Sequence, residues 1–264
     1  MNILNKILEA KKTEVKILRS DYSYERFRDS AYFDEKGFSF SNAINKGNSI
    51  AIISEIKKAS PSKGIIKKDF DHISIARIYF SNSADAVSIL TDRTFFQGSI
   101  NFLRDIAEFK SAPLLRKDFI IDEFQVYEAK SNGADAILLI CEILSSAQIN
   151  ELTLCAKEIG MDTLLELHSK EEIEKIDFSI NSIIGINNRD LGTFSVDINR
   201  TKEISPLLPG EVIIVSESGI KGKKDFDLLK ENRINAALIG GHLMRAEDLP
   251  GAFSQLKEWS RFES

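Results

Sequence analysis

From residue 49 onward, short runs of aliphatic and β-branched residues alternate with longer amphipathic segments. Several of these runs are apolar at every position, which is typical of parallel strands buried on both faces. The segments between them are long enough to be the helices that connect parallel strands. The predicted strands are residues 50–54, 86–90, 113–116, 136–140, 163–165, 183–186, 212–215 and 237–239.

The predicted helices between the strands include residues 75–80, 100–109, 123–131, 146–159, 170–176 and 224–231. Eight strand–helix units in a chain of 264 residues favour a closed (β/α)8 TIM barrel, a fold that typically needs about 250 residues. The alternative is an open, doubly wound sheet, but no Gly-x-Gly-x-x-Gly follows an early strand. No low-complexity linker divides the chain, so we expect a single α/β domain over residues 1–264.

Residues 1–48 precede the first strand and predict an N-terminal helical extension to the barrel of residues 49–264. Apolar residues recur there at near-helical spacing among lysines and glutamates. A helix packed on the surface with no part in binding explains the pattern equally well. The recurring apolar residues are Ile3, Leu4, Ile7, Leu8, Val15 and Leu18.

The overall charge excludes several classes of partner. The chain carries 35 Lys and Arg against 40 Asp and Glu, a formal net charge of −5, which argues against binding to nucleic-acid backbones. Neither Cys141 nor Cys155 has metal-type spacing. The N-terminus lacks a signal core, and no apolar run approaches the roughly 18 residues of a membrane span. We therefore expect a cytoplasmic protein that does not associate with membranes.

The stretch after the first predicted strand is rich in charge and hydroxyl groups. Glu55 and Lys57 stand two residues apart, so on a strand their side chains share one face. An opposite-charge pair at the end of an apolar strand costs desolvation free energy unless it serves a site. Residues 60–64, Ser-Pro-Ser-Lys-Gly, offer donors to an anion, although a solvated turn explains this stretch equally well.

Polar residues follow seven of the eight predicted strands. In a (β/α)8 barrel the carboxyl ends of the strands meet at one rim, where active sites form. One polar strand end is usually a helix cap or an ion pair, but seven at the same rim indicate an active site. The polar strand ends include Glu55, Lys57, Asp92, Lys117, Glu166, Asn187, Arg189, Glu217, Ser218 and His242.

The fourth predicted strand has an apolar end instead. Leu138, together with Phe96 and Phe119, suits a substrate with an aromatic part, although ordinary packing at the barrel mouth explains these residues equally well. After the last two strands, Gly219 and the pair at 240–241 bring backbone amides to expected helix starts. Such amides and the helix dipole favour a phosphate group.

The stretch Glu-Ile-Lys-Lys-Ala-Ser-Pro-Ser at residues 55–62 resembles the signature of the indole-3-glycerol-phosphate synthase family. The resemblance continues in order over nearly the whole chain, through residues 90–92, 96–99, 115–119, 165–168, 185–191, 216–220 and 238–240. It implies the conversion of 1-(2-carboxyphenylamino)-1-deoxyribulose 5-phosphate to indole-3-glycerol phosphate in tryptophan biosynthesis. This carboxy-lyase reaction releases carbon dioxide and water, and the resemblance implies no metal or organic cofactor.

The resemblance also implies catalytic roles. An aromatic carbon must attack a ketone whose oxygen then needs a proton, and the family's strand-3 lysine acid matches Lys117. We expect like charges and partial burial to lower the pKa of Lys117. Loss of the hydroxyl and of a ring proton needs an acid and a base, and the matching positions are Glu55, Lys57 and Glu166. Whether Lys57 or Glu166 serves the dehydration stays open.

The remaining site residues are carried over by the same resemblance. Arg189 matches a residue beside the substrate carboxylate, which its planar fork suits. The residues that orient the substrate match Asn187, Glu217 and Ser218. The phosphate ligands match Lys57, Ser60, Gly219, Gly240 and Gly241. The resemblance further implies that the helical extension helps to cover the barrel mouth.

The chain departs from the family pattern after the last strand, where Gly241 and His242 stand in place of a common serine or glutamate. His242 is a possible substitute donor, and a surface histidine is the simpler interpretation. We expect His168 to be structural.

Two other functions fit these residues less well. Phosphoribosylanthranilate isomerase uses a Cys and an Asp at strand ends as its acid–base pair, and Cys141 is not placed for this role. A catalytically silent barrel would tend to lose Lys117 or Glu166. We therefore expect a monofunctional enzyme that acts on a sugar phosphate without an obligate protein partner.

Overall fold

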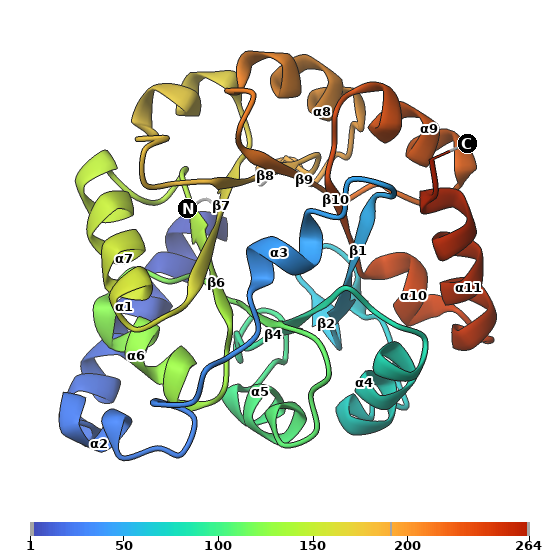
Figure 1. Ribbon diagram of the computed structural model, residues 1–264. Helices are drawn as coiled ribbons and strands as arrows, with labels where there is room; N and C mark the ends of the chain where they lie inside the picture. The colour runs from blue at the N-terminus through green and yellow to red at the C-terminus, as the bar shows by residue number, and fades with distance from the viewer. Residues whose placement is uncertain (1–2, 191, 263–264) are drawn as a thin grey trace.

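Eight parallel strands close into a barrel in the order β1, β4, β5, β6, β7, β8, β9, β10 and back to β1. Figure 1 shows the computed structural model, which describes residues 3–190 and 192–262, so that residue 191 of the stretch 185–191 lies outside them. The predicted (β/α)8 barrel is confirmed. Its strands are β1 (Ala51–Ile56), β4 (Ala86–Leu90), β5 (Leu114–Lys117), β6 (Ala136–Ile140), β7 (Asp162–Leu167), β8 (Ile183–Asn187), β9 (Ile213–Glu217) and β10 (Ala236–Ile239).

Helices surround the barrel, and most follow the predicted segments (Figure 1). The predicted helix at 170–176 is instead the 3₁₀ helix η1 (Lys170–Lys175), and α8 and α11 were not among the predicted segments, whereas α10 begins at the glycine pair where a helix start was expected. Side chains of Asp or Ser accept from the backbone at the start of several helices, as N-caps do. The helices are α4 (His72–Ser81), α5 (Ile100–Ala107), α6 (Glu123–Ser131), α7 (Ser146–Glu158), α8 (Asn199–Ile204), α9 (Lys223–Glu231), α10 (Gly241–Arg245) and α11 (Leu249–Ser260), with η2 (Ser205–Leu207) after α8.

The strands separate two apolar cores because their side chains point alternately to opposite faces. In β1, Ala51 and Ile53 belong to the cluster inside the barrel. Ile52 and Ile56 belong to the cluster between the strands and the helices. This is why the predicted strands read as continuous apolar runs.

The same alternation places the polar end of several strands in the barrel mouth. Every second residue of a strand points into the barrel, and at the end of five strands the last inward residue is polar. These residues are Glu55 of β1, Lys117 of β5, Glu166 of β7, Asn187 of β8 and Glu217 of β9. Parallel pairing then sets these ends side by side, for example Asn187 opposite Glu217. The site is therefore the uppermost layer of the barrel interior.

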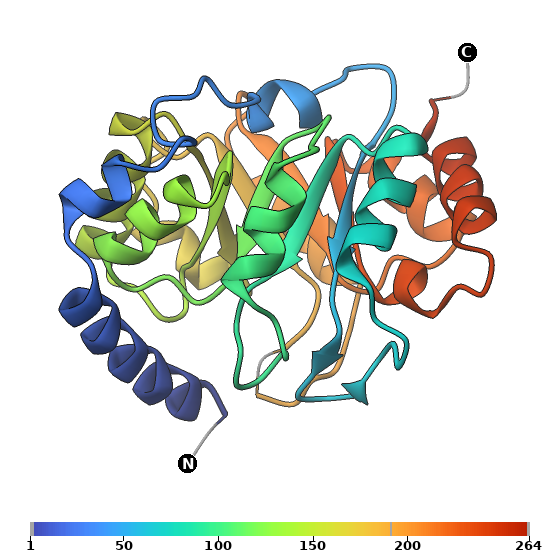
Figure 2. The same ribbon diagram turned by 90° about the horizontal axis from the view of Figure 1, so that it is seen from below.

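The N-terminal extension closes one end of the barrel and packs beside the other. It consists of α1 (Ile3–Asp21), α2 (Tyr24–Arg28) and α3 (Phe40–Ile44). Phe40 and Ile44 of α3 are fully buried in the inner cluster, and Figure 2 shows α3 across the end opposite the hairpin of β2 (Ala59–Ser60) and β3 (Gly64–Ile65). Leu4 and Ile7 of α1 join the same cluster, whose partly buried members include the aromatic rings at 95 and 96 near the mouth.

A buried lysine ties α1 to the loops after β4 and β5. Lys11 is 1% exposed, and its Nζ lies 2.8 Å from Oδ2 of Asp92 and 2.8 Å from Oδ1 of Asp118. Asp92 in turn accepts from the backbone N–H of Phe95 and Phe96. The extension therefore supports the turn that carries Phe96. Within residues 3–190 and 192–262, no helix is both long and apolar enough to cross a membrane.

Candidate active site

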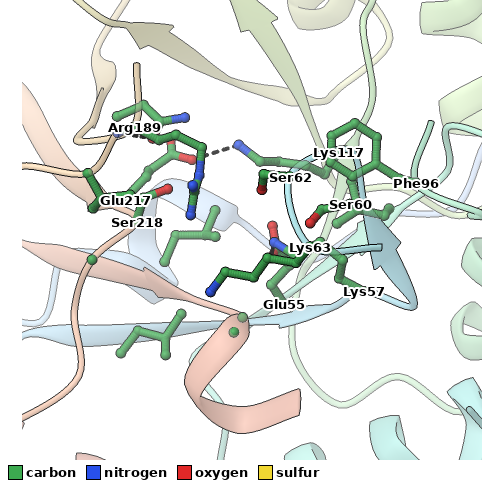
Figure 3. Close-up of a pocket in the computed structure, with 18 of the residues that line it drawn as sticks. Glu55, Lys57, Ser60, Ser62, Lys63, Phe96, Lys117, Arg189, Glu217 and Ser218 are labelled. Atoms are coloured by element: carbon green, nitrogen blue, oxygen red, sulfur yellow. Dashed lines mark hydrogen bonds and ion pairs between the residues drawn. The ribbon is translucent and has the colours of Figure 1, made fainter. Parts of the chain in front are cut away.

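A pocket of about 380 Å³ opens at the carboxyl ends of the strands, beside the β2–β3 hairpin (Figure 3). All the residues that the sequence predicted for the site line this pocket. They are Glu55, Lys57, Ser60, Phe96, Lys117, Phe119, Leu138, Glu166, Asn187, Arg189, Glu217, Ser218, Gly219, Gly240 and Gly241.

Lys117 holds the centre of the pocket floor between two carboxylates. Its Nζ lies 2.6 Å from Oε2 of Glu166 and 2.6 Å from Oε2 of Glu217. Burial lowers the pKa of Lys117, but the charges of Glu166, Glu217 and Glu55 outweigh burial and raise it. The predicted lowering of this pKa is therefore wrong, because the nearest charged groups are opposite and not like charges.

The two carboxylates beside Lys117 differ in their pKa. Burial raises the pKa of Glu217 to about 8, with Lys117 opposing and Glu166 adding to the rise. Burial also opposes ionisation of Glu166, but Lys117 and His168 hold its pKa well below the usual range. Near neutral pH, Glu166 is ionised and Glu217 keeps a proton for much of the time, because the negative charge of one carboxylate opposes ionisation of the other.

Two glycines make room for glutamates inside the mouth. A Cβ at Gly240 would lie 2.0 Å from Oε2 of Glu55, and a Cβ at Gly185 would lie 2.4 Å from Oε1 of Glu217. Glu55 also forms an ion pair with Lys57 on the same face. The predicted pairing is thus present, and Gly240 has a steric role that the sequence alone did not suggest.

The loop after β8 carries Arg189 into the pocket. The backbone N–H of Arg189 donates to Oδ1 of Asn187 at 3.0 Å, and its Nη1 donates to the carbonyl of Phe194 at 3.0 Å. Partial burial lowers the pKa of Arg189, with Glu55 opposing. No carboxylate forms an ion pair with Arg189 within the described residues, so its guanidinium is available to an anion.

The turn after β9 presents two successive residues with left-handed backbone. Ser218 has φ of +66° and Gly219 has φ of +87°. Serine rarely adopts this conformation, and such strain gathers at functional sites. The carbonyl of Ser218 accepts from Nδ2 of Asn188 at 3.0 Å, which holds the turn against β8.

One side of the pocket is apolar. The rings of Phe96 and Phe119 lie with centroids 6.1 Å apart, and Leu138 packs in the same cluster. This side can receive an aromatic group. Figure 3 shows Phe96 beside Ser60 and away from Arg189, so the apolar and cationic sides of the pocket are separate.

Three cations lie at the rim, of which only Lys63 falls in a stretch, 60–64, that the sequence predicted to offer donors to an anion. Lys63 in the β2–β3 hairpin, Lys221 after β9 and Arg245 in α10 line the pocket, and none forms an ion pair among the described residues. Partial burial lowers the pKa of Lys63, and the neighbouring cations at 245, 189, 221 and 57 lower it further. Basic residues in loops after three different strands were the only sequence signal. This unbalanced positive charge suits an anionic substrate.

The two histidines near the mouth differ. His242 lines the pocket, and burial together with Arg245 lowers its pKa. His168 is 8% exposed and contacts Oε1 of Glu166 at 2.9 Å. Within the described part of the chain, no group of three or more His, Cys, Asp or Glu residues is placed to hold a metal ion.

Fold and pocket together define a barrel enzyme with acid–base groups on its floor and free cations at its rim. The family model described as indole-3-glycerol phosphate synthase matches residues 4–256. The chain therefore belongs to the indole-3-glycerol phosphate synthase family.

Named relatives agree with this assignment. The indole-3-glycerol phosphate synthase of Alkaliphilus metalliredigens is 45% identical over 255 residues, which cover 97% of this chain and 98% of that one. The enzyme of the same name from Endomicrobium trichonymphae is 43% identical over 97% of this chain and 100% of its own length. That of Desulfotalea psychrophila is 46% identical over 92% of this chain and 94% of its own.

Solved structures share the fold at low identity. The 3-hexulose-6-phosphate synthase of Salmonella typhimurium superposes with a TM-score of 0.65 at 11% identity, over 80% of this chain and 98% of that one. A chain of the tryptophan synthase a2b2 complex of Pyrococcus furiosus gives 0.59 at 14% identity, over 80% and 99%. At such identities the likeness concerns the barrel alone.

Proposed function

We propose that this enzyme converts 1-(2-carboxyphenylamino)-1-deoxyribulose 5-phosphate to indole-3-glycerol phosphate, releasing carbon dioxide and water, as a carboxy-lyase of tryptophan biosynthesis. Family membership supports the reaction. The observation that carries the chemistry is Lys117, held between Glu166 and Glu217 on the floor of a pocket with a cationic rim.

In the first step, the ring carbon that bears the carboxylate bonds to the ketone carbon, and the ketone oxygen takes a proton from Lys117. The raised pKa of Lys117 means that it is protonated at neutral pH. Its carboxylate partners oppose release of that proton, but a developing alkoxide is a much stronger base than a lysine amine. Lys117 therefore acts as an acid only once negative charge develops on the ketone oxygen.

In the second step, the bond between the ring and the carboxylate breaks and its electron pair returns to the ring system. The ring-closed intermediate accepts these electrons itself, so the step needs no electron sink from the protein. Before it, Arg189 orients the carboxylate through its planar fork. Phe96, Phe119 and Leu138 receive the aromatic ring on the apolar side of the pocket.

In the third step, the new hydroxyl leaves as water and a ring proton is lost. Because the pKa of Glu166 is held low, this group is ionised: it has no proton to donate, and its carboxylate can accept the ring proton. Lys57 is then the acid for the leaving hydroxyl, and its ion pair with Glu55 holds its side chain at the pocket. Asn187 and Ser218 orient the sugar hydroxyls beside these groups.

The phosphate is held by the Ser60 hydroxyl and by the backbone of Gly219, Gly240 and Gly241, all of which line the pocket. We also propose that the enzyme works in the cytoplasm without an obligate protein partner. The site residues all come from one chain, and the relatives named above match it over nearly their full length.

The direct test supplies the carboxyphenylamino substrate and follows the indole product by its fluorescence. We expect product from the wild type and a loss of at least about 100-fold in kcat for K117A, with the fold retained, because removing a general acid typically costs 10²–10⁴. K223A, which removes an exposed lysine on α9, is the matched control. Absence of product from the wild type would overturn the function, and full activity in K117A would remove Lys117 from the mechanism.

A further inference from the structure

His168 stands two residues after Glu166 and is almost completely buried at the edge of the pocket. Its Nε2 lies 2.9 Å from Oε1 of Glu166, and its Nδ1 lies 3.0 Å from the carbonyl oxygen of Arg189. Its backbone N–H donates to Oε2 of Glu172 at 2.5 Å, which fixes the start of η1. The ring thus bridges β7 and the loop after β8.

Both partners of the ring can only accept hydrogen bonds. A backbone carbonyl has no proton, and the Glu166 carboxyl is ionised because its pKa is held low. A neutral imidazole has one N–H and could satisfy only one of the two contacts. Only the doubly protonated imidazolium of His168 can donate to both acceptors at once. Burial opposes that charge, but Glu166 and the Arg189 carbonyl outweigh burial and raise the pKa of His168.

The other charged groups around His168 favour the same state. Glu172 on η1 and Glu142 after β6 add negative charge from two further elements. The guanidinium of Arg189 donates instead to the carbonyl of Phe194 and makes no contact with the imidazole among the described residues. Three carboxyl groups thus face His168.

Glu166 consequently lies between two cations, with Oε2 on Lys117 and Oε1 on His168. Once Lys117 gives its proton to the substrate ketone, Glu166 loses one of these positive partners. His168 keeps the other in place. Glu166 can then remain ionised through the reaction, ready to accept a proton in the dehydration step.

We propose that His168 is a positioning residue of this reaction, whose imidazolium holds Glu166 ionised and oriented and ties it to the loop that carries Arg189. This role rests on the proposed function of the pocket. It also replaces the expectation that His168 is merely structural. The ring contacts the carboxylate of Glu166, the proposed base, and the backbone carbonyl of Arg189, the proposed ligand of the substrate carboxylate.

The first test compares H168N with the wild type in the indole fluorescence assay. We expect kcat to fall by about 10- to 100-fold, the usual cost of removing a residue that orients a functional group, with less than about threefold change in KM. The acid limb of the kcat profile should move up by roughly one to two pH units, because loss of a cation raises the pKa of Glu166.

The matched control is H72N, the same exchange in the other histidine–carboxylate pair of the structure, where Nε2 of His72 lies 3.0 Å from Oδ2 of Asp105. It should leave kcat and the pH profile unchanged. A wild-type kcat and pH profile in H168N would overturn the proposal, as would equal losses in H168N and H72N. Absence of turnover in the wild type would instead overturn the proposed function.

The second test does not depend on turnover. Nitrogen-15 NMR of the wild-type histidines should show both ring nitrogens of His168 protonated near neutral pH, and His168 should titrate at higher pH than His242. E166Q should lower the pKa of His168. A neutral His168 ring at pH 7, or no change in its titration in E166Q, would overturn the proposal even if H168N failed to fold.

Discussion

Replacing Lys11 with methionine perturbs the contact that ties α1 to the barrel. The Nζ of Lys11 lies 2.8 Å from carboxylate oxygens of Asp92 and Asp118, which are 0% and 3% exposed. Methionine keeps most of the apolar stem and removes the charge. Both buried carboxylates then lose a cationic partner, and this costs more than an exposed ion pair would.

The free energy of unfolding should fall by about 3 kcal/mol at pH 7, the low end of the roughly 3–5 kcal/mol that breaking a buried pair costs. The low end applies because Asp118 keeps Arg116 and the Thr91 hydroxyl, and Asp92 keeps two backbone donors. Burial opposes ionisation of Asp118, yet Lys11 and Arg116 lower its pKa to about 2. That depression from the unfolded-state value is equivalent to about 2–3 kcal/mol, to which Lys11, Arg116 and the Thr91 hydroxyl all contribute.

The sign of the pH dependence follows from this lowered pKa. A carboxylate whose pKa is depressed in the folded state contributes stability that is fully present above its unfolded pKa of about 3.9. The contribution is lost as the pH falls toward 2, through the folded pKa of Asp118. The difference in unfolding free energy between wild type and K11M should therefore narrow between about pH 5 and pH 2.

The measurement is urea unfolding followed by far-ultraviolet circular dichroism at pH 7 and pH 3. The control is K12M, since Lys12 is the next residue but is 65% exposed, and its partner Glu9 is 66% exposed. An exposed pair of this kind should contribute less than about 1 kcal/mol. If K11M and K12M lose the same small amount, the buried cluster does not hold α1 as argued.

Three further predictions concern the pocket. S60A should raise KM roughly tenfold with little change in kcat, because a phosphate contact stabilises ground and transition states alike; a pure loss of kcat would contradict this assignment. G240A should lower kcat by at least about tenfold, since its Cβ would lie 2.0 Å from the Glu55 carboxylate. G222A is the control and should leave kcat unchanged, because a Cβ at Gly222 would meet no atom within 4 Å. Burial raises the pKa of Glu217 to about 8, so its ionisation destabilises the fold as the pH rises from about 4.3 toward 8. The loss of unfolding free energy in E217Q relative to wild type, measured by urea unfolding, should therefore be smaller at pH 8 than at pH 5. A larger loss at pH 8 would refute this.

The fold was predictable because each barrel strand is buried on both faces. A strand such as β6 (Ala136–Ile140) is apolar throughout and stands out in any part of the chain. Less regular segments were harder to predict. The helix α8 has six residues, too short for helical periodicity to show, and η1 is a 3₁₀ helix of six residues.

The membership of the pocket was also predictable, and its electrostatics were not. Residues at the carboxyl ends of parallel strands must meet at one rim, whatever their separation in the chain. The pKa of Lys117 depends instead on distances to Glu166 and Glu217, which are 49 and 100 residues away. The expectation of a lowered pKa failed because no sequence pattern reports which charges face one another.

By itself, the sequence determined the barrel, the order of its strands' polar ends and the family, since these follow from apolar periodicity and from motifs at fixed positions along the chain. The tertiary structure alone decided three things: that α3 closes the end of the barrel opposite the pocket, that Gly240 makes room for Glu55, and that His168 joins Glu166 to the Arg189 loop. The physical reason is that steric space and charge interactions act through distances of a few ångströms between segments remote in sequence, and only the closed barrel sets those distances.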